Sequence, residues 1–334
     1  MTIGDGLVRL RANQIGVQSA FGTAVPATRR VPWRGLVTYD PSRTDPDVDT
    51  GSIDPVLKPV GSVPVIELAA TGPLIYNDLP YRLNAGLKGG VTPTGGGATK
   101  TWTYTLASLT ADPFQFFTVE SGDDQSATDG IQAYGGVIDS FSETMGEDLG
   151  VIEFSDTWVF GAANLATDRT GALSVDTSPT FVMGDETFIT IDSAAGSIGA
   201  TPVTDALHAA TLTVSNNLDR KRFANGSNSR RKLAGYGRGA RVIELVLTFA
   251  KTAATMAEEN TLDDDPVPNR YIQLTTNSIT SPYVYQRGGA FRLFSVADGE
   301  IGGNATKVLT YRSFYDATLG YAFKAVITNT LAAL

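Results

Sequence analysis

The chain contains no cysteine, and only one of its 334 residues is a histidine. The absence of cysteine excludes disulfides, thiolate metal sites and a cysteine nucleophile. The lone His208 has no neighbours that complete a nucleophile–base pair, so we expect it to be structural. The sequence has no G-x-S-x-G, phosphate-loop or H-E-x-x-H motif. We therefore predict that the protein is not an enzyme and needs no cofactor.

Charge and long apolar runs are also scarce. Only 18% of the residues are charged, and no apolar run approaches the ~20 residues of a membrane span. The first residues, MTIGDGLVRLRANQ, have no apolar signal-peptide core. The net charge of −9 argues against attraction of the whole molecule to nucleic acid. We expect a soluble protein made in the cytoplasm, without membrane contact.

The acidic run at residues 263–265 is a candidate for a metal site. It lacks the ligand spacing of a calcium-binding loop, so we predict a solvated turn and no bound metal. The glycine clusters Gly95–Ala98 and Gly288–Ala290 do not lead into helices, which argues against phosphate binding. We predict that both clusters are hairpin turns.

Glycine, serine and threonine are abundant, and this composition favours strands and turns over helices. Two late segments, residues 151–160 and 321–331, alternate between apolar and polar side chains. Such alternation is typical of strands with one buried and one exposed face. The predicted exposed positions are Glu153, Ser155 and Thr157 in the first segment and Lys324, Thr328 and Thr330 in the second.

Several landmarks recur 177 positions apart in the same order, which is typical of a duplicated unit. The letters V-I-E-L occur at residues 65–68 and 242–245, and F-x-x-F-x-V occurs at 114–119 and 291–296. Gly22 falls on Gly199, Tyr134 on Tyr311 and Asp139 on Asp316. We predict unit A at residues 1–165, a linker at 166–181 and unit B at 182–334. The alternative is two unrelated β domains that share letters by chance.

Each unit is predicted to carry one short helix after its V-I-E-L strand. In unit A the helix spans residues 77–88, with Asn77 as its cap and Pro80 tolerated in its first turn. In unit B the helix begins at Thr255, with Glu258 completing a capping box.

The long loops that precede the V-I-E-L strands carry opposite charge. The loop of unit A holds acidic residues, among them Asp45, Asp47, Asp49 and Asp54. The loop of unit B holds basic residues, among them Arg220, Lys221, Arg222, Arg230, Arg231 and Lys232. Three interpretations are open: two solvated loops, nucleic-acid binding by the basic loop, or docking between the loops of different subunits. Docking is favoured, because complementary patches joined head to tail build rings and stacks.

Three passages together resemble the tail tube proteins of long-tailed bacteriophages. They are QSAFGTAVPATRRVPW near the start, ELAATGPLIYNDLPYRL around the first helix, and DSFSETMGEDLGVIEFSDTWVFG at the late hairpin. The resemblance implies two tandem antiparallel β-sandwich or barrel units, each with one flanking helix. It also implies trimeric rings that imitate six-fold symmetry and stack into a tube.

The resemblance further implies a virion tail protein whose partners are copies of itself and the tape-measure, terminator and baseplate proteins. DNA is expected to pass through the lumen without specific binding. The lumen candidates are Glu143, Glu153, Ser155, Thr157, Lys324, Thr328 and Thr330. The alternatives are a trimeric baseplate hub, a distal tail ring protein, or a carbohydrate-binding or adhesin β protein.

Overall fold

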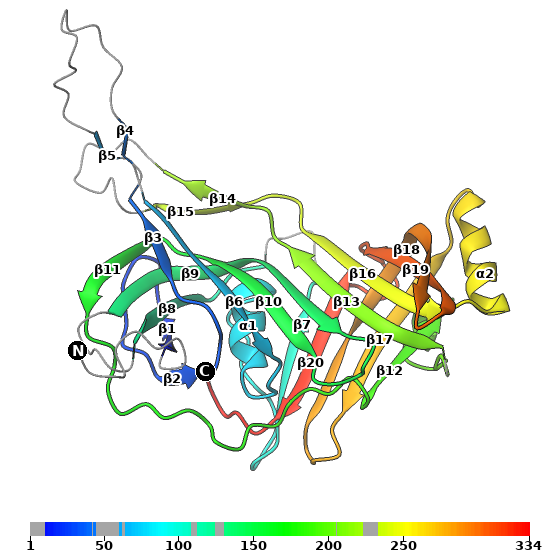
Figure 1. Ribbon diagram of the computed structural model, residues 1–334, viewed down its shortest axis with the longest axis horizontal. Coiled ribbons are helices and arrows are strands. Elements are labelled where there is room, and N and C mark those ends of the chain that lie inside the picture. The colour runs from blue at the N-terminus through cyan, green and yellow to red at the C-terminus, as the bar shows by residue number, and fades with distance from the viewer. Residues whose placement is uncertain are drawn as a thin grey trace, which may run out of the picture.

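The protein is built mainly of antiparallel β-strands, as the composition predicts (Figure 1). The computed structural model describes residues 11–41, 43–44, 60–61, 64–107, 112–123, 130–204, 206–222 and 233–334. One 16-stranded sheet runs through both halves of the chain, and the two-stranded ladders β4–β5 and β14–β15 stand apart from it.

The elements of the first half are β1 (Arg11–Gln18), β2 (Arg29–Val31), β3 (Thr38–Asp40), β4 (Arg43–Thr44), β5 (Val60–Gly61), β6 (Val65–Pro73), α1 (Leu79–Gly86), β7 (Lys100–Thr105), β8 (Phe116–Asp123), β9 (Gly130–Met145), β10 (Glu153–Val159) and β11 (Ala162–Thr167). Those of the second half are β12 (Thr187–Asp192), η2 (Ala195–Ser197), β13 (Leu207–Ser215), β14 (Leu218–Lys221), β15 (Gly235–Arg238), β16 (Val242–Ala250), α2 (Ala253–Asn260), η4 (Thr261–Asp263), β17 (Asn269–Asn277), β18 (Val284–Ile301), β19 (Asn304–Ser313) and β20 (Phe323–Asn329).

The two halves repeat one pattern of strand pairing. In the first half β3, β6, β10 and β9 lie side by side, while β1 joins β8, and β8 and β11 also pair with β9. In the second half β13, β16, β19 and β18 lie side by side, while β12 joins β17, and β17 and β20 also pair with β18. Each half is therefore a four-stranded segment with a second set of strands attached to the long strand β9 or β18.

The register of pairing repeats as well. Glu67 lies opposite Val159 in the first half, and Glu244 lies opposite Arg312 in the second. Each late hairpin also carries one β-bulge, at Asp139 in β9 and at Phe294 in β18. Because a bulge inserts one unpaired residue at a defined step, its recurrence at the same step is strong evidence of duplication.

The separation of 177 positions holds for the V-I-E-L strands but not throughout the halves. Before them, the equivalent residues Thr38 and Thr213 are 175 positions apart (213 minus 38). Past the helices, the equivalent residues Thr157 and Thr310 are 153 positions apart (310 minus 157). The first half contains β7 between its helix and β8, whereas in the described second half α2 leads to β17 without such a strand. The Tyr134–Tyr311, Asp139–Asp316 and F-x-x-F-x-V matches are therefore not structural equivalents, and β20 corresponds to β11 rather than to β10. Gly22 and Gly199 both follow the first strand of their half, and both have positive φ angles, of 85° and 88°.

The two helices differ in start and surroundings. Helix α1 lies within the predicted residues 77–88, but its cap position is Asp78, whose carboxylate binds Arg29 at 2.6 Å. Helix α2 begins after Thr252, whose hydroxyl accepts from the Thr255 amide. The capping box therefore joins Thr252 and Thr255, and the prediction of Thr255 with Glu258 is wrong. Every residue of α1 is buried, whereas Thr255 is the buried residue of α2.

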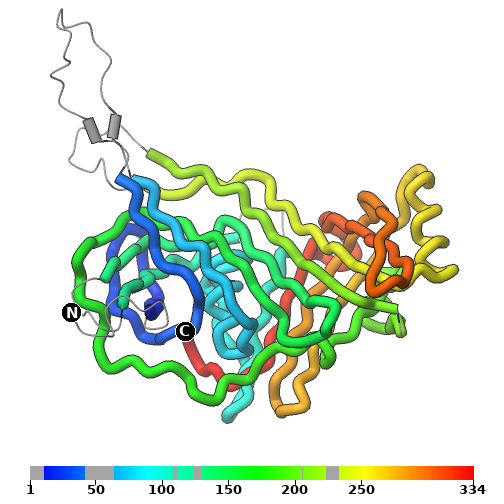
Figure 2. The backbone as a smooth tube through the Cα atoms, in the orientation of Figure 1, coloured from blue at the N-terminus to red at the C-terminus, as the bar shows by residue number. Residues whose placement is uncertain are grey.

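One hydrophobic core extends through both halves. In the first half Trp158 is fully buried, stacked on Phe160 and in edge contact with Phe117. The chain passes from β11 to β12 through residues 168–180, which form no helix or strand and run along the lower side of Figure 2. The predicted linker falls on this segment, and the two halves share their core across it.

One glycine prediction fails. Gly95 lies in a turn between the paired residues Thr94 and Thr101, so that cluster is in a hairpin turn. Gly288 and Gly289 instead lie in the middle of β18, where β17 and β20 both pair with it. An added Cβ at either position would approach a neighbouring backbone oxygen to 2.3 Å or less. These glycines therefore permit close strand approach and do not form a turn.

Candidate functional site: a shared sheet and its open edges

The two halves are joined by an antiparallel ladder between β9 and β13. Ser140 lies opposite Ser215, Ser142 opposite Thr213 and Thr144 opposite Thr211. The ladder makes the four strands of each half into one continuous sheet segment (Figure 1).

A buried ion cluster lies beneath this ladder. Arg82 of α1 forms a two-pronged contact with Asp156, with donor–acceptor distances of 2.6 and 2.7 Å. Glu143 lies 3.4 Å from Arg82 and 3.1 Å from Arg287, and it accepts a hydrogen bond from Tyr285 at 3.0 Å. Arg287 and Tyr285 belong to β18, so the second half of the chain covers an acid of the first.

Burial dominates the electrostatics of this cluster. It raises the pKa of Asp156 above its ordinary value, although the Arg82 guanidinium counteracts the shift. Burial also lowers the pKa of Arg82, but attraction to Asp156 and Glu143 outweighs it, so the net shift is upward. Both shifts follow from the removal of charged groups from water, which only close, well-oriented partners offset.

Asn216 anchors the same junction and is fully buried. Its side-chain amide donates to the carbonyl oxygens of Gly86 and Ile138 at 2.7 and 3.0 Å. Its side-chain oxygen accepts from Arg241 at 3.0 Å, and its backbone amide donates to Asp139 at 2.7 Å. One side chain thus connects α1, β9 and the chain after β13.

We expect Asn216→Leu to lower the free energy of unfolding by about 2 kcal/mol, because buried hydrogen-bonding groups lose their partner. Urea unfolding of the monomeric protein measures the loss. The control is Asn217→Gly, since Asn217 is exposed and has a φ of 50° that glycine adopts readily. Equal stability of Asn216→Leu and the unmodified protein would contradict this anchoring role.

The hairpin β14–β15 carries the described part of the basic loop and folds onto its own chain. Arg220 forms an ion pair with Glu67, and Tyr236 donates to the carbonyl oxygens of Gly135 and Val159. Arg238 lies 3.8 Å from the centre of the Phe114 ring. Burial, reinforced by the charge of Arg241, lowers the pKa of Arg238 to about 10, against the opposing influence of Asp112.

Lys221 and Arg222 are exposed, so they stay available for the predicted contact between subunits, whereas Arg220 is engaged within the chain. The other predicted loop residues lie outside the described residues; they are Asp45, Asp47, Asp49, Asp54, Arg230, Arg231 and Lys232. The predicted docking between oppositely charged loops stays a prediction.

A polar face covers the outer side of the shared sheet. It crosses seven neighbouring strands from β6 to β18, and its members are opposite one another in the ladders. We define the polar face as Glu67, Ala69, Thr71, Ser140, Ser142, Thr144, Glu153, Ser155, Thr157, Thr211, Thr213, Ser215, Glu244, Val246, Thr248, Ser295, Ala297, Gly299, Val308, Thr310 and Arg312. None of these side chains is buried. Its charged members are three glutamates and Arg312, which pairs with Glu244 at 3.0 Å.

The predicted lumen residues divide into three groups. Glu153, Ser155 and Thr157 are exposed and belong to the polar face. Glu143 is 2% exposed and held by arginines in the core, so its prediction as a lumen residue is wrong. A one-residue difference in register places its side chain on the opposite side of the sheet from Ser142.

The other three candidates lie elsewhere. Lys324 and Thr328 are in β20, and Thr330 follows it; β20 pairs with β18 and β7 rather than with a strand next to β10. The structure therefore does not bring them together with Glu153, Ser155 and Thr157. Equating the two late strands caused this error, because β20 is the counterpart of β11.

No family model matches the chain, and no curated protein is significantly similar to it. Within the described residues, no three residues of the types His, Cys, Asp and Glu cluster in a way that could hold a metal ion. The helices of that same part of the chain are too short or too polar to cross a bilayer. His208 is partly exposed and lines a shallow hollow beside β12.

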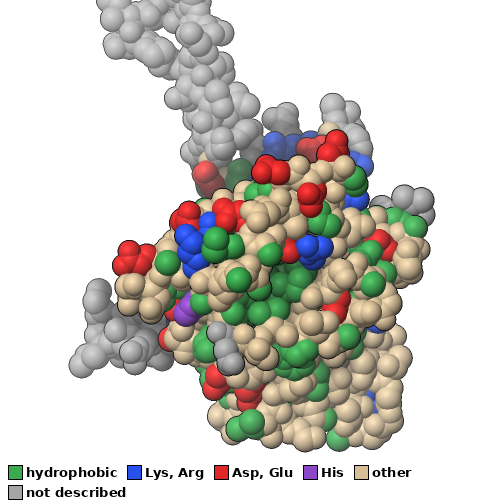
Figure 3. Space-filling model, turned by 90° about the vertical axis from the view of Figure 1, so that its right-hand side faces the viewer, with side chains coloured by type: hydrophobic (Ala, Val, Ile, Leu, Met, Phe, Trp, Pro, Cys, Tyr) green, Lys and Arg blue, Asp and Glu red, His purple; other side chains and the backbone are tan. Residues whose placement is uncertain are grey.

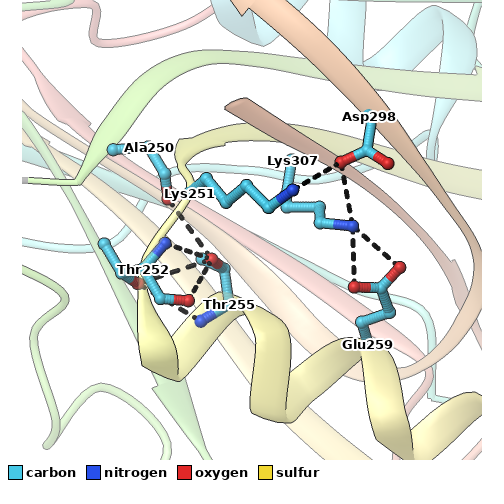
Figure 4. Close-up of polar contacts among 7 residues, drawn as sticks. All are labelled: Ala250, Lys251, Thr252, Thr255, Glu259, Asp298 and Lys307. Atoms are coloured by element: carbon cyan, nitrogen blue, oxygen red, sulfur yellow. Dashed lines mark hydrogen bonds and ion pairs between the residues drawn. The ribbon is translucent and has the colours of Figure 1, made fainter. Parts of the chain in front are cut away.

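The second half has an ion cluster at the corresponding position (Figure 4), but its acid is exposed to water, unlike Glu143. Asp298 occupies the place of Glu143, and Lys307 and Lys251 approach it to 3.0 and 3.4 Å. Lys307 also binds Glu259 of α2 at 2.7 Å. Hydrogen bonds from Lys307 and Lys251 lower the pKa of Asp298. The Asp298 side chain is 69% exposed, against 1% for Glu143.

The molecule is open beside α2 as well. A hollow of about 430 Å³ lies between this helix and the sheet, lined by Ile191, Val203, Phe249 and Leu309. Figure 3 faces this end of the molecule and shows hydrophobic side chains gathered at its centre. The corresponding helix of the first half is covered completely.

Two strand edges are open at opposite ends of the molecule. Strand β3 pairs with β6 on one side, and no described strand pairs with its other side. Beyond Phe294, β18 pairs with β19 alone among the described strands, although the equivalent part of β9 pairs with both β10 and β13. These open edges lie at the left and right ends of the sheet in Figure 1.

Proposed function

We propose that the protein is a structural component of a bacteriophage tail, forming rings that stack into the tail tube. The observation that carries the proposal is the duplicated four-stranded segment, joined within the chain by β9 and β13 and open at both ends. Unpaired strand edges promote association with other strands, and closure of a sheet into a barrel removes them. Head-to-tail contacts of one kind generate such rings.

The polar face supports the assignment of the inner surface. In a closed ring this face would line the lumen, and it carries more carboxylates than cations among its described residues. Every contact between a cation and a phosphate adds salt-dependent affinity for DNA. A surface rich in serine, threonine and glutamate would instead let DNA pass without being held.

We further propose that three chains close each ring, so that six repeats surround the lumen. The protein would reside in the virion tail after synthesis in the host cytoplasm. Its other partners would be the tape-measure, terminator and baseplate proteins. Lys221 and Arg222 of the basic loop are candidates for contacts between stacked rings.

Electron microscopy of the purified protein tests this proposal. We expect cylinders of uniform width to form as the concentration rises. Single rings that never stack would instead indicate a baseplate hub or distal tail ring. A protein that stays monomeric at every concentration and binds a glycan array would contradict the tube role and indicate an adhesin.

A further inference from the structure

The internal junction between β9 and β13 provides a template for a second junction between copies. Strand β3 corresponds to β13, because Thr38 lies opposite Glu67 in the same way that Thr213 lies opposite Glu244. The partners of β3 and β13 are the two V-I-E-L strands. The open side of β3 is therefore the side that β13 uses to pair with β9.

The open part of β18 corresponds to the part of β9 that receives β13. Ser140 and Ser295 occupy equivalent places after the bulges, opposite Thr157 and Thr310. From there, β18 continues to Glu300 along the same course that β9 takes to Met145. In β9 this stretch carries β13 from Ser140 to Met145.

We propose that β18 residues 295–297 of one copy pair in antiparallel fashion with β3 residues 38–40 of a second copy. The register is that of the internal junction, transferred residue by residue. The pairs are Ser295 with Asp40, Val296 with Tyr39 and Ala297 with Thr38. The ladder ends there, because the Val37 amide donates to the Ser121 hydroxyl and the Gly35 carbonyl accepts from Asn13 within one copy. This inference rests on the proposed function, since it specifies the contact that closes the ring.

Side chains at the two open edges complement each other in this register. At the internal junction the bulge residue Asp139 accepts hydrogen bonds from the amides of Asn216 and Leu218. At the open edge the bulge residue is Phe294, which is 55% exposed, and the residue in the place of Asn216 is the exposed Pro41. The polar residues Asp139 and Asn216 of the internal junction are thus replaced at the open edges by the apolar residues Phe294 and Pro41. Two apolar groups brought together are removed from water, which favours association.

The sizes of two side chains near the proposed contact, those of Leu36 and Gly299, also complement each other. Thr144 and Thr211 face each other at the internal junction, whereas the transferred register places Leu36 against Gly299. A side chain at Gly299 would come within 2.7 Å of the Thr306 hydroxyl, so this position is restricted to a small residue. Leu36 lies two residues before the paired segment, where its larger side chain would face this small residue.

The exposed acid Asp298 gains a role in this arrangement. At the internal junction Glu143 is covered by Arg287 and Tyr285 of the adjoining half. Asp298 already binds two lysines of its own half, but water still reaches it. Docking of the second copy would bury this ion cluster as the first is buried.

Engineered disulfides test the register. Because the chain contains no native cysteine, only the introduced thiols can form cross-links. Residues directly opposite in an antiparallel pair have Cα atoms about 4.5–5.5 Å apart, within the range that a disulfide bridges. Ala297→Cys combined with Thr38→Cys should give covalent oligomers on oxidation. As a positive control, Ser142→Cys with Thr213→Cys should form a bridge inside one chain.

The register control is Ala297→Cys with Arg34→Cys, which displaces one thiol by roughly 13 Å along the strand. We expect about tenfold less cross-linked product from this pair than from Ala297→Cys with Thr38→Cys. Normal cylinders without cross-links at residues 297 and 38 would reject the register while leaving the tube role intact. The absence of any assembly by the unmodified protein would reject the proposed function itself.

Discussion

Asp156→Asn is expected to lower the free energy of unfolding by about 3–5 kcal/mol, because it leaves a buried positive charge without its main partner. The carboxylate makes both short contacts to the Arg82 guanidinium, and both side chains are at most 1% exposed. The remaining cluster would hold two arginines against Glu143 alone. Urea unfolding followed by tryptophan fluorescence, at a concentration where the protein is monomeric, measures the effect.

Two controls distinguish the effect of an unpaired buried charge from a nonspecific loss of stability. Arg82→Met with Asp156→Leu removes both charges and should recover most of the loss, since apolar replacements of a buried pair are often well tolerated. Glu244→Gln breaks the exposed pair with Arg312 and should cost less than about 1 kcal/mol. If Asp156→Asn were no worse than Glu244→Gln, the cluster would not stabilise the junction.

Gly289→Ala is the second large effect, with an expected loss of about 3 kcal/mol from overpacking. The added methyl group would lie 2.1 Å from the Ala322 carbonyl oxygen and 3.0 Å from the Cα atom of Phe323. Both atoms belong to the backbone, so β18 and the segment leading into β20 would have to separate. Circular dichroism during heating measures the lowered midpoint.

Gly196→Ala is the matched control, because no atom lies within 4 Å of its added Cβ and its φ is not positive. It should change stability by less than about 0.5 kcal/mol. Equal melting temperatures for the two variants would show that β18 adapts easily, contrary to the close strand approach described above.

Local patterns in the sequence predicted the strands and faces well. The V-I-E-L strands, the first helix and the alternating strand β10 lie where alternation and four-residue spacing place them. These features depend on side chains a few residues apart. The β-rich class follows from the same local information, because turn-forming and β-branched residues act locally.

Long-range equivalence was harder to predict. The insertion of β7 shifts the register between the halves, so letters that match at 177 positions stop being equivalent after the helices. The prediction of a turn at Gly288 is wrong, because a sequence does not reveal how closely neighbouring strands approach. The burial of Glu143 depends on Arg287 and Tyr285, which lie more than 140 residues away and carry no local signal of the contact.

Because the β9–β13 junction lies inside one polypeptide, it restricts the number of repeats that a closed assembly can contain. Each added chain brings two repeats at once, so a ring of this protein always contains an even number of them. A ring that is too large or too small by a single repeat cannot form, and the smallest possible error in size is a whole chain. Gene fusion of two repeats would in this way make ring size easier to control than assembly from separate single repeats.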